Sequence, residues 1–237
     1  MKQRPSIKQV FAWILFVTLL LSIGFSAVKI VTAPNGPTAL QEGERLSSDY
    51  VLMLVQCLLG LVVMFLPSLL ERRFHISLPN SMCVMYFLFL YCAIYLGEVR
   101  NFYFVIPHWD TLLHGFSAMM LGALGFSLVS ILNESERTRV NLSPLFVGLF
   151  AFSFAVSVGV LWEIYEFSFD GLLGMNMQKF RLEDGALLIG REALADTMED
   201  LITDTLGALL VAAVGALLLK RRQPKGPAAP APEGTKQ

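Results

Sequence analysis

The sequence has 237 residues, of which 55% are hydrophobic and only 16% are charged, whereas soluble domains average roughly 45–50% apolar and 25% charged residues. This composition excludes a soluble globular fold, and a net charge of −1 gives no indication of a nucleic-acid partner. Cys57, Cys83 and Cys92 lie inside apolar stretches, so a disulfide framework is not expected.

Six apolar stretches approach or exceed the roughly 20 residues that a helix needs to cross a membrane. The first is longer than the ~7–15-residue core of a signal peptide, so we expect a retained anchor. The sequence predicts an all-α polytopic membrane bundle, with one domain over residues 1–222 and a disordered tail over 223–237. The six predicted spans cover residues 10–30, 49–70, 81–96, 110–132, 144–167 and 200–219.

The basic residues predict the orientation of this bundle. With the N-terminus inside, twelve of the 18 Lys and Arg residues fall in cytoplasmic segments and six fall on the opposite side. Cytoplasmic loops of membrane proteins carry an excess of Lys and Arg, so we expect both termini in the cytoplasm.

The last three predicted spans carry their ionisable residues at the outer ends, three or four positions apart. Residues at these spacings share one face of a helix, so three helices can bring these groups to one depth. They are Asp110 and His114 on the fourth span, Glu163 and Glu166 on the fifth, and Asp196, Asp200 and Asp204 on the sixth.

Asp204 is expected to lie inside the hydrocarbon core. Fifteen residues separate it from Lys220, a rise of about 22 Å at ~1.5 Å per residue, against a core of about 30 Å. Submerged acids face the bundle interior and need a partner, and clustered carboxylates repel unless protons or a cation balance them.

Carboxylates with one imidazole suit Zn, Mn or Fe, and oxygen ligands alone suit Mg or Ca. Either protons or a divalent metal could balance the cluster, and the candidate metals are Zn, Mn, Fe and Mg. The predicted ligands are Asp110, His114, Glu163, Asp196 and Asp200, and the predicted general base or outer-sphere residues are Glu166 and Asp204.

Simpler roles compete with this hypothesis at several positions. Asp110 could be no more than a helix N-cap. Asp196 and Glu199 could be no more than acids that complement the positive N-terminal end of a helix. Glu98 is expected to form an exposed ion pair with Arg100, which contributes little. His75 and His108 are expected to lie outside the site. The long outer hinge over residues 170–195 could form a lid, contact a substrate anion or be an ordinary solvated loop. Its polar residues are Asn176, Gln178, Arg181 and Arg191.

Small residues form stripes on the fourth and sixth spans, which allow close helix packing or simply reflect membrane composition. These residues are Gly115, Ala118, Gly122 and Gly125, and Ala208, Ala212 and Gly215.

Four motifs in order resemble the YjdF-like family of bacterial inner-membrane proteins, over about residues 80 to 220. They are WDTLLHGF at 109–116, WEIYEF at 162–167, GMNMQ at 174–178 and DTMEDL at 196–201, followed by Asp204 and Gly207. The resemblance implies a multi-pass protein of the bacterial cytoplasmic membrane and no particular reaction. The order of an Asp/His helix, an acidic helix and an Asp-led helix is more loosely similar to the VanZ-like membrane proteins, whose Gln and Asn positions are not clearly matched here.

Three functions agree with these residues. The first is a metal-dependent hydrolase or transferase that acts at the outer surface on a membrane lipid, either a lipid-linked molecule or a head group. The second is an ion or proton-coupled transporter, ranked lower because the inner halves of the last three spans lack ionisable residues. The third is a non-catalytic membrane scaffold or binding protein.

Overall fold

The computed structural model describes residues 5–34, 45–75, 77–134, 142–182 and 185–222. Six of its helices are long and apolar enough to cross a membrane. This confirms the prediction of an all-α, six-span bundle. The predicted disordered tail, residues 223–237, lies outside the described residues.

The spans are built from six long helical segments, two of which are interrupted. The first span is α1 (Ile7–Thr32), the second joins α2 (Ser47–Val63) and α3 (Leu66–Phe74), and the third joins α4 (Asn80–Leu90) to a π-helix, η2 (Tyr91–Val99). The short α5 (Phe102–Val105) precedes the last three spans, α6 (Trp109–Glu134), α7 (Pro144–Leu173) and α8 (Arg191–Arg222).

Local sequence explains where several of these helices begin and end. Ser6 and Gln9 form a capping box at the start of α1. Ser143 caps α7, with Pro144 in its first turn, and Gly174 ends this helix in the left-handed conformation at φ 65°. The helix α7 continues to Leu173 and α8 begins at Arg191, so the outer connection covers residues 174–190 and is shorter than the expected hinge at 170–195.

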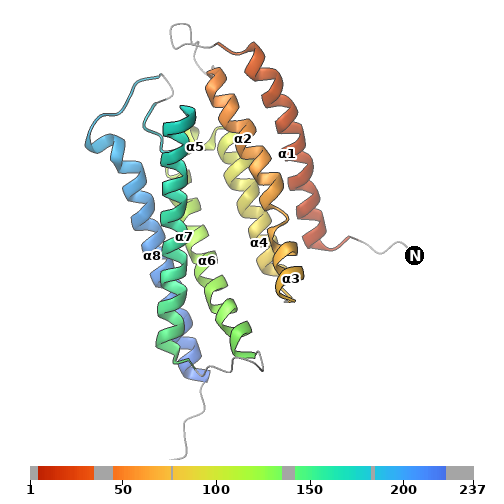
Figure 1. Cartoon of the computed structure of the whole chain (residues 1–237), viewed down its shortest axis with the longest axis vertical. Helices are drawn as coiled ribbons and strands as arrows, with labels where there is room; N and C mark the ends of the chain where they lie inside the picture. The colour runs from red at the N-terminus through yellow and green to blue at the C-terminus, as the bar shows by residue number, and fades with distance from the viewer. Residues whose placement is uncertain (1–4, 35–44, 76, 135–141, 183–184, 223–237) are drawn as a thin grey trace, which may run out of the picture.

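The six spans form two groups of three, the first three spans in one group and the last three in the other (Figure 1). In the first group, α1 packs against α2 and α4, and η2 packs against α2. In the second group, α6, α7 and α8 all pack against one another. The first group has an apolar core of Leu15, Leu19, Met53, Cys57, Met64, Cys83, Phe87, Leu90 and Ile94.

The second group is held together by small residues. A Cβ added at Gly125 of α6 would lie 2.8 Å from the Cα of Ala151 on α7, so only glycine allows this approach. Ala208 and Ala212 of α8 are buried in the same group. The small-residue stripes of the sequence thus lie where helices are in close contact.

A cavity of about 830 Å³ lies between the two groups. Its lining residues come from α2, α3, α4, η2, α5, α6, α7 and the 174–190 connection, and Asp204 of α8 also contributes. Figure 1 shows that α1 begins and α8 ends at one end of the bundle, whereas the 174–190 connection lies at the other. The acidic residues belong to this second end, because they lie at the start of α6 and α8 and the end of α7.

Candidate metal centre

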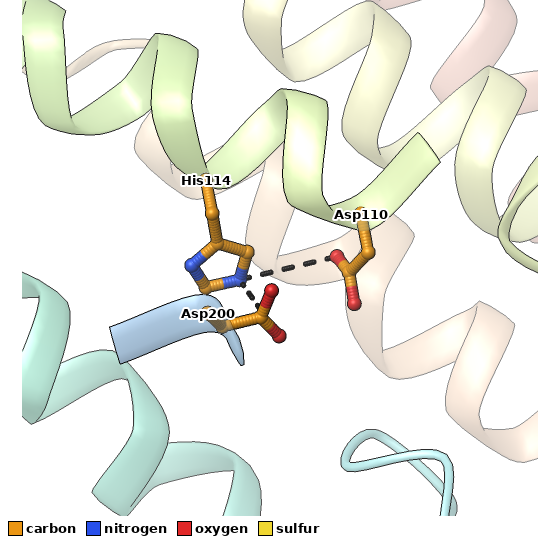
Figure 2. Close-up of side chains that lie close together, drawn as sticks. All are labelled: Asp110, His114 and Asp200. Carbon is orange, nitrogen blue, oxygen red and sulfur yellow. Dashed lines mark ion pairs between the residues drawn. The ribbon is translucent and has the colours of Figure 1, made fainter. Parts of the chain in front are cut away.

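His114 lies at the centre of a ring of carboxylates from three helices. Its Nε2 is 3.9 Å from Asp110 Oδ1, 3.8 Å from Glu163 Oε1 and 3.7 Å from Asp200 Oδ2. Its Nδ1 is 3.3 Å from Asp204 Oδ2. Figure 2 shows one nitrogen of the His114 imidazole on α6 facing both the carboxylate of Asp110 on the same helix and that of Asp200 on α8. The helical spacing read from the sequence therefore does bring these groups together.

Four of the five groups in this ring are almost completely buried, and the fifth, Asp110, is partly buried. The exposed fraction is 2% for Asp200, 3% for Asp204, 5% for Glu163 and 7% for His114. Among the described residues, Asp200 Oδ2, Asp204 Oδ1 and His114 Nδ1 have no hydrogen-bond partner. A buried carboxylate oxygen without a partner is costly, so the ring requires bound protons or a cation to balance it.

Three of these residues are close enough to bind one ion. Asp110, His114 and Asp200 each offer a ligand atom, and these atoms all lie within 4.8 Å of one another. One imidazole nitrogen with two carboxylate oxygens is a common ligand set for divalent transition metals. The unpartnered oxygens of Asp200 and Asp204 fit the same role, so this grouping could hold a metal.

Gly159 of α7 makes room for Asp204. A Cβ built at this glycine would collide with the Asp204 carboxylate. The absence of a side chain at Gly159 thus lets an acid of α8 reach between α6 and α7. The sequence gives no spacing signal for this pairing, because the two residues lie on different helices.

Lys179 supplies a cation at the edge of the ring. Its Nζ contacts Asp110 Oδ2, lies 3.8 Å from Asp196 Oδ1, and stands 4.7 Å from the centre of the Tyr103 ring. Lys179 has a positive φ of 48°, a conformation that costs roughly 1–3 kcal/mol outside glycine. Burial lowers the pKa of the Lys179 ammonium from its usual value, against the opposing influence of the acids Asp196 and Asp200.

The connection that carries Lys179 is anchored to α7 and α8. Asp170 Oδ1 accepts a hydrogen bond from the backbone N–H of Met177 at 2.7 Å, and its Oδ2 accepts one from that of Gln178 at 2.9 Å. The side chain of Gln178 donates to Thr197 Oγ1 at 2.7 Å. Asp170 and Gln178 therefore position Lys179 and are not free to bind a ligand themselves.

The remaining predicted site residues lie around this centre. Glu166 is buried and lines the cavity. Asp196 faces Lys179 at the edge of the ring. Glu199 is exposed, as expected for an acid that only complements the start of a helix. Asn176 exchanges hydrogen bonds with the backbone of Arg181 and so shapes the connection.

A second polar group on the opposite wall of the cavity was missed by sequence reasoning. Arg181 Nη2 lies 2.9 Å from Asp49 Oδ1 of α2, and Arg45 Nη1 donates to the backbone carbonyl of Glu98 at 3.0 Å. These four residues line the same cavity as His114. Their only sequence signal is a charge at the end of an apolar stretch.

The prediction of an exposed Glu98–Arg100 ion pair is wrong. Glu98 is half-buried and lines the cavity, whereas Arg100 is exposed. The reason is local geometry, because Glu98 belongs to the π-helix η2, and Arg100 follows its end. A π-helix has a wider turn than an α-helix, so spacing rules for α-helices do not give the direction of its side chains.

Comparison with known proteins gives a family but no reaction. The model of a family described as "Predicted membrane protein (DUF2238)" matches residues 9–221. A protein of Thermotoga maritima described as "Uncharacterized protein" is 31% identical over 144 residues, which are 60% of this chain and 66% of the relative. The matched part thus covers slightly less than two thirds of that relative. No solved structure matches the chain.

Proposed function

Since the chain belongs to the family described as "Predicted membrane protein (DUF2238)", we propose that this multi-pass membrane protein is a metal-dependent hydrolase or transferase. Its substrate is a lipid-linked molecule or a lipid head group at the extracytoplasmic face of the bacterial cytoplasmic membrane. The YjdF-like resemblance and the distribution of Lys and Arg support this location and orientation.

The observation that carries the proposal is the His114 ring. Four carboxylates from three helices lie within 3.9 Å of one imidazole, and among the described residues three of them, Glu163, Asp200 and Asp204, have an unpartnered buried oxygen. A purely structural cluster would be expected to satisfy these atoms with donors. A divalent ion balances several carboxylates at once and leaves the imidazole neutral as a ligand.

Each residue of the ring has a proposed role. Asp110, His114 and Asp200 bind the ion, and Glu163 is the fourth ligand because it approaches the same Nε2 at 3.8 Å. The Lys179 ammonium contacts Asp110 and lies close to Asp196, so it must move away before either carboxylate binds the ion. Glu166 and Asp204 both line the cavity, where either can take a proton from an attacking water or hydroxyl group. A bound metal acidifies its water and polarises a phosphoryl or acyl oxygen.

The ligand set favours Zn, Mn or Fe over Mg. Mg prefers oxygen ligands and retains several waters, whereas the central group here is an imidazole that is 7% exposed. Mn accepts both carboxylate and imidazole ligands and is therefore a suitable first probe.

A transporter receives less support from the cavity. An ion path needs polar or charged groups across the membrane. From Leu52 to Leu66 on the α2 and α3 side, the lining residues are apolar except for Gln56, and on α6 Leu113 and Ser117 are followed by Met120 and Leu121. This apolar half suits a hydrocarbon chain better than a hydrated ion.

Metal content in purified protein tests the proposal. Wild type, His114→Asn and His108→Asn are stripped with chelator, reloaded with Mn, Zn, Fe or Mg, and analysed by mass spectrometry. We expect about one equivalent in wild type and less than a tenth of that in His114→Asn. His108 is exposed and lies at φ 58°, which asparagine tolerates, so His108→Asn should load as wild type does. Negligible metal in all three proteins would contradict the proposal.

Turnover separates an enzyme from a metal-binding scaffold. Glu166→Gln and Asp204→Asn should lower the release or transfer of head groups from added lipid by at least 100-fold, because general acid–base groups contribute roughly 10²–10⁴. Wild-type activity that survives both substitutions would favour a different chemistry.

A further inference from the structure

The cavity between the two helix groups has the shape and charge pattern of a lipid site. We propose that it holds one phosphate-bearing membrane lipid, whose phosphate lies between Arg45 and Arg181 on one wall and the metal at His114 on the other. The apolar chain of the lipid follows α2 toward α3. This proposal rests on the metal-dependent function and adds to it the class of substrate.

The apolar part of the cavity follows one face of the second span. Leu52, Gln56, Leu59, Val63 and Leu66 all line it, and their alternating spacing of four and three residues keeps them on one side of the helix. Fourteen residue steps correspond to about 21 Å at ~1.5 Å per residue. The lining thus extends through most of a hydrocarbon core of about 30 Å.

The facing walls of this part are also apolar. Phe89, Leu90 and Ala93 contribute from the third span, Leu121 from α6 and Val158 from α7. The whole cavity has a volume of about 830 Å³, and an apolar part that extends over this depth favours a hydrocarbon chain over water. Its length along the helix axis is the feature that points to a lipid and not to a small soluble molecule.

The polar end of the cavity carries acids and cations on both sides, because Lys179 lies beside Asp110, and Asp49 and Glu98 lie beside Arg181 and Arg45. Asp110, His114 and Asp204 lie on the α6–α8 side, whereas Arg45 and Arg181 lie across the cavity beside α2. Arg45 donates to a backbone carbonyl, and within the described chain it forms no ion pair with a carboxylate. Guanidinium groups and a divalent metal both bind phosphate oxygens strongly, so a phosphate would satisfy both walls at once.

The acid side is more than a surface cluster. Asp204 is 3% exposed, its Oδ1 has no hydrogen-bond partner among the described residues, and it lines the cavity. An unpartnered buried oxygen facing the same space as Arg45 indicates that a ligand completes the site. The net charge of the side chains that line the cavity then determines whether an anionic ligand can bind there.

Phosphate binding should depend on the metal. The lining carries more carboxylates than cations, namely Asp49, Glu98, Asp110, Glu166 and Asp204 against Arg45, Lys179 and Arg181. An anionic head group is repelled by this excess unless a divalent ion offsets it. Linkage then requires that the lipid and the metal raise each other's affinity by the same factor.

Lipid binding to delipidated protein in detergent, counted by native mass spectrometry, tests the proposal. The probes are dioleoyl phosphatidic acid, dioleoylglycerol with the same chains but no phosphate, and inorganic phosphate, each with and without Mn²⁺. With Mn²⁺ we expect one phosphatidic acid per chain, bound at least tenfold more tightly than either dioleoylglycerol or inorganic phosphate. Equal binding of phosphatidic acid and dioleoylglycerol would overturn the proposal.

Variants assign this binding to the two parts of the cavity. Arg45→Gln combined with Arg181→Gln should reduce the preference for phosphatidic acid at least tenfold, whereas Arg191→Gln, at the exposed start of α8, should not. Loss of the Asp49–Arg181 ion pair could unsettle the fold, so Leu59→Trp provides a second variant. It should weaken phosphatidic acid and dioleoylglycerol alike by filling the apolar part. Unchanged lipid binding in both variants would place the lipid elsewhere and overturn the proposal.

The metal content of the same samples distinguishes the two proposals. Protein that binds Mn²⁺ but does not prefer phosphatidic acid overturns the lipid proposal and leaves the metal-dependent function standing. Protein that binds no metal overturns the metal-dependent function. A preference for phosphatidic acid that needs Arg45 and Arg181 but no metal would overturn the metal's part in phosphate binding and leave a site made by the two arginines alone.

Discussion

The ammonium group of Lys179 contacts the carboxylate of Asp110, although 69 positions separate the two residues in the sequence. Lys179 therefore provides the cation for one edge of the His114 ring in the absence of a metal. It also lies over the Tyr103 ring, in a backbone conformation that side chains rarely adopt. Because a metal and this ammonium both compete for Asp110, the lysine should control both the stability of the metal-free protein and its affinity for metal.

Lys179→Met should destabilise the metal-free protein and tighten metal binding. Removing one partner of a buried ion pair costs roughly 3–5 kcal/mol. Lys179 and Asp110 keep side-chain exposures of 17% and 18%, so we expect about 2 kcal/mol, or a fall in Tm of about 4–8 °C. Added Mn²⁺ should restore much of this loss, because the ion replaces the missing charge. Thermal unfolding with and without Mn²⁺ measures both effects.

Lys29→Met is the matched control for this substitution. Lys29 lies over the aromatic rings of Phe25 and Tyr50 at the end of α1. It does not contact any of the carboxylates around His114. Its removal should change Tm by less than about 2 °C and should not alter the response to Mn²⁺. Equal changes in Tm for the two substitutions would mean that the Lys179–Asp110 contact contributes no more to stability than Lys29 does.

Stability should depend on pH through Lys179. Burial lowers the pKa of its ammonium below the usual value of 10.5, so the folded protein releases this proton at a lower pH than the unfolded chain. The unfolded chain then binds more protons between the two pKa values, and stability rises with pH over that interval. The Tm of wild type minus that of Lys179→Met should increase as the pH rises toward 10.5. A difference that stays constant or falls would contradict the lowered pKa.

Glu163→Gln should have opposite effects on stability and on metal binding. The glutamine keeps the shape of Glu163 but removes one of the buried negative charges around His114. Less repulsion should raise the Tm of the metal-free protein by about 2–4 °C, equivalent to ~1 kcal/mol in a chain of this size. Metal content should fall, because a neutral amide is a weaker ligand than a carboxylate. A loss of stability on this substitution would argue that Glu163 is satisfied by protein groups alone.

Gly159→Ala should disturb the site from a position that binds nothing itself. The added Cβ would collide with the Asp204 carboxylate, so this acid must shift. We expect a destabilisation of about 1–3 kcal/mol, as for other overpacked sites, together with reduced metal content. Gly171→Ala on the same helix is the control, because a Cβ there meets nothing within 4 Å. If both variants keep wild-type metal content, Asp204 is not held where the structure has it.

Helical periodicity explains why much of the ring could be predicted. Asp110 and His114 are one turn apart on α6, and Asp200 and Asp204 are one turn apart on α8. In a membrane bundle such faces turn inward because lipid is a poor environment for charge. Asp204 could be assigned to the interior from its distance to Lys220 alone.

The other wall of the cavity could not be predicted in this way. Arg181 and Asp49 are 132 positions apart. One lies in a loop and the other at the start of a helix, where sequence periodicity does not predict the direction of a side chain. Glu98 was assigned to the surface because the wide turn of η2 is not visible in the sequence. Lys179 follows the recognisable Gly-Met-Asn-Met-Gln motif, but only the hydrogen bonds of Asp170 bring it to Asp110.

The loop that carries Lys179 is fastened chiefly to one half of the molecule. Asp170 of α7 and Thr197 of α8 hold it by hydrogen bonds. Among the described residues it meets the other half through the Arg181–Asp49 ion pair and through Met177, which contacts Leu52 and Gln56. If the two halves sway relative to each other, the ammonium and the acids travel as one block. Such a motion would change the width of the cavity between the two helix groups, while the contacts of Lys179 with Asp110 and Asp196 stay intact.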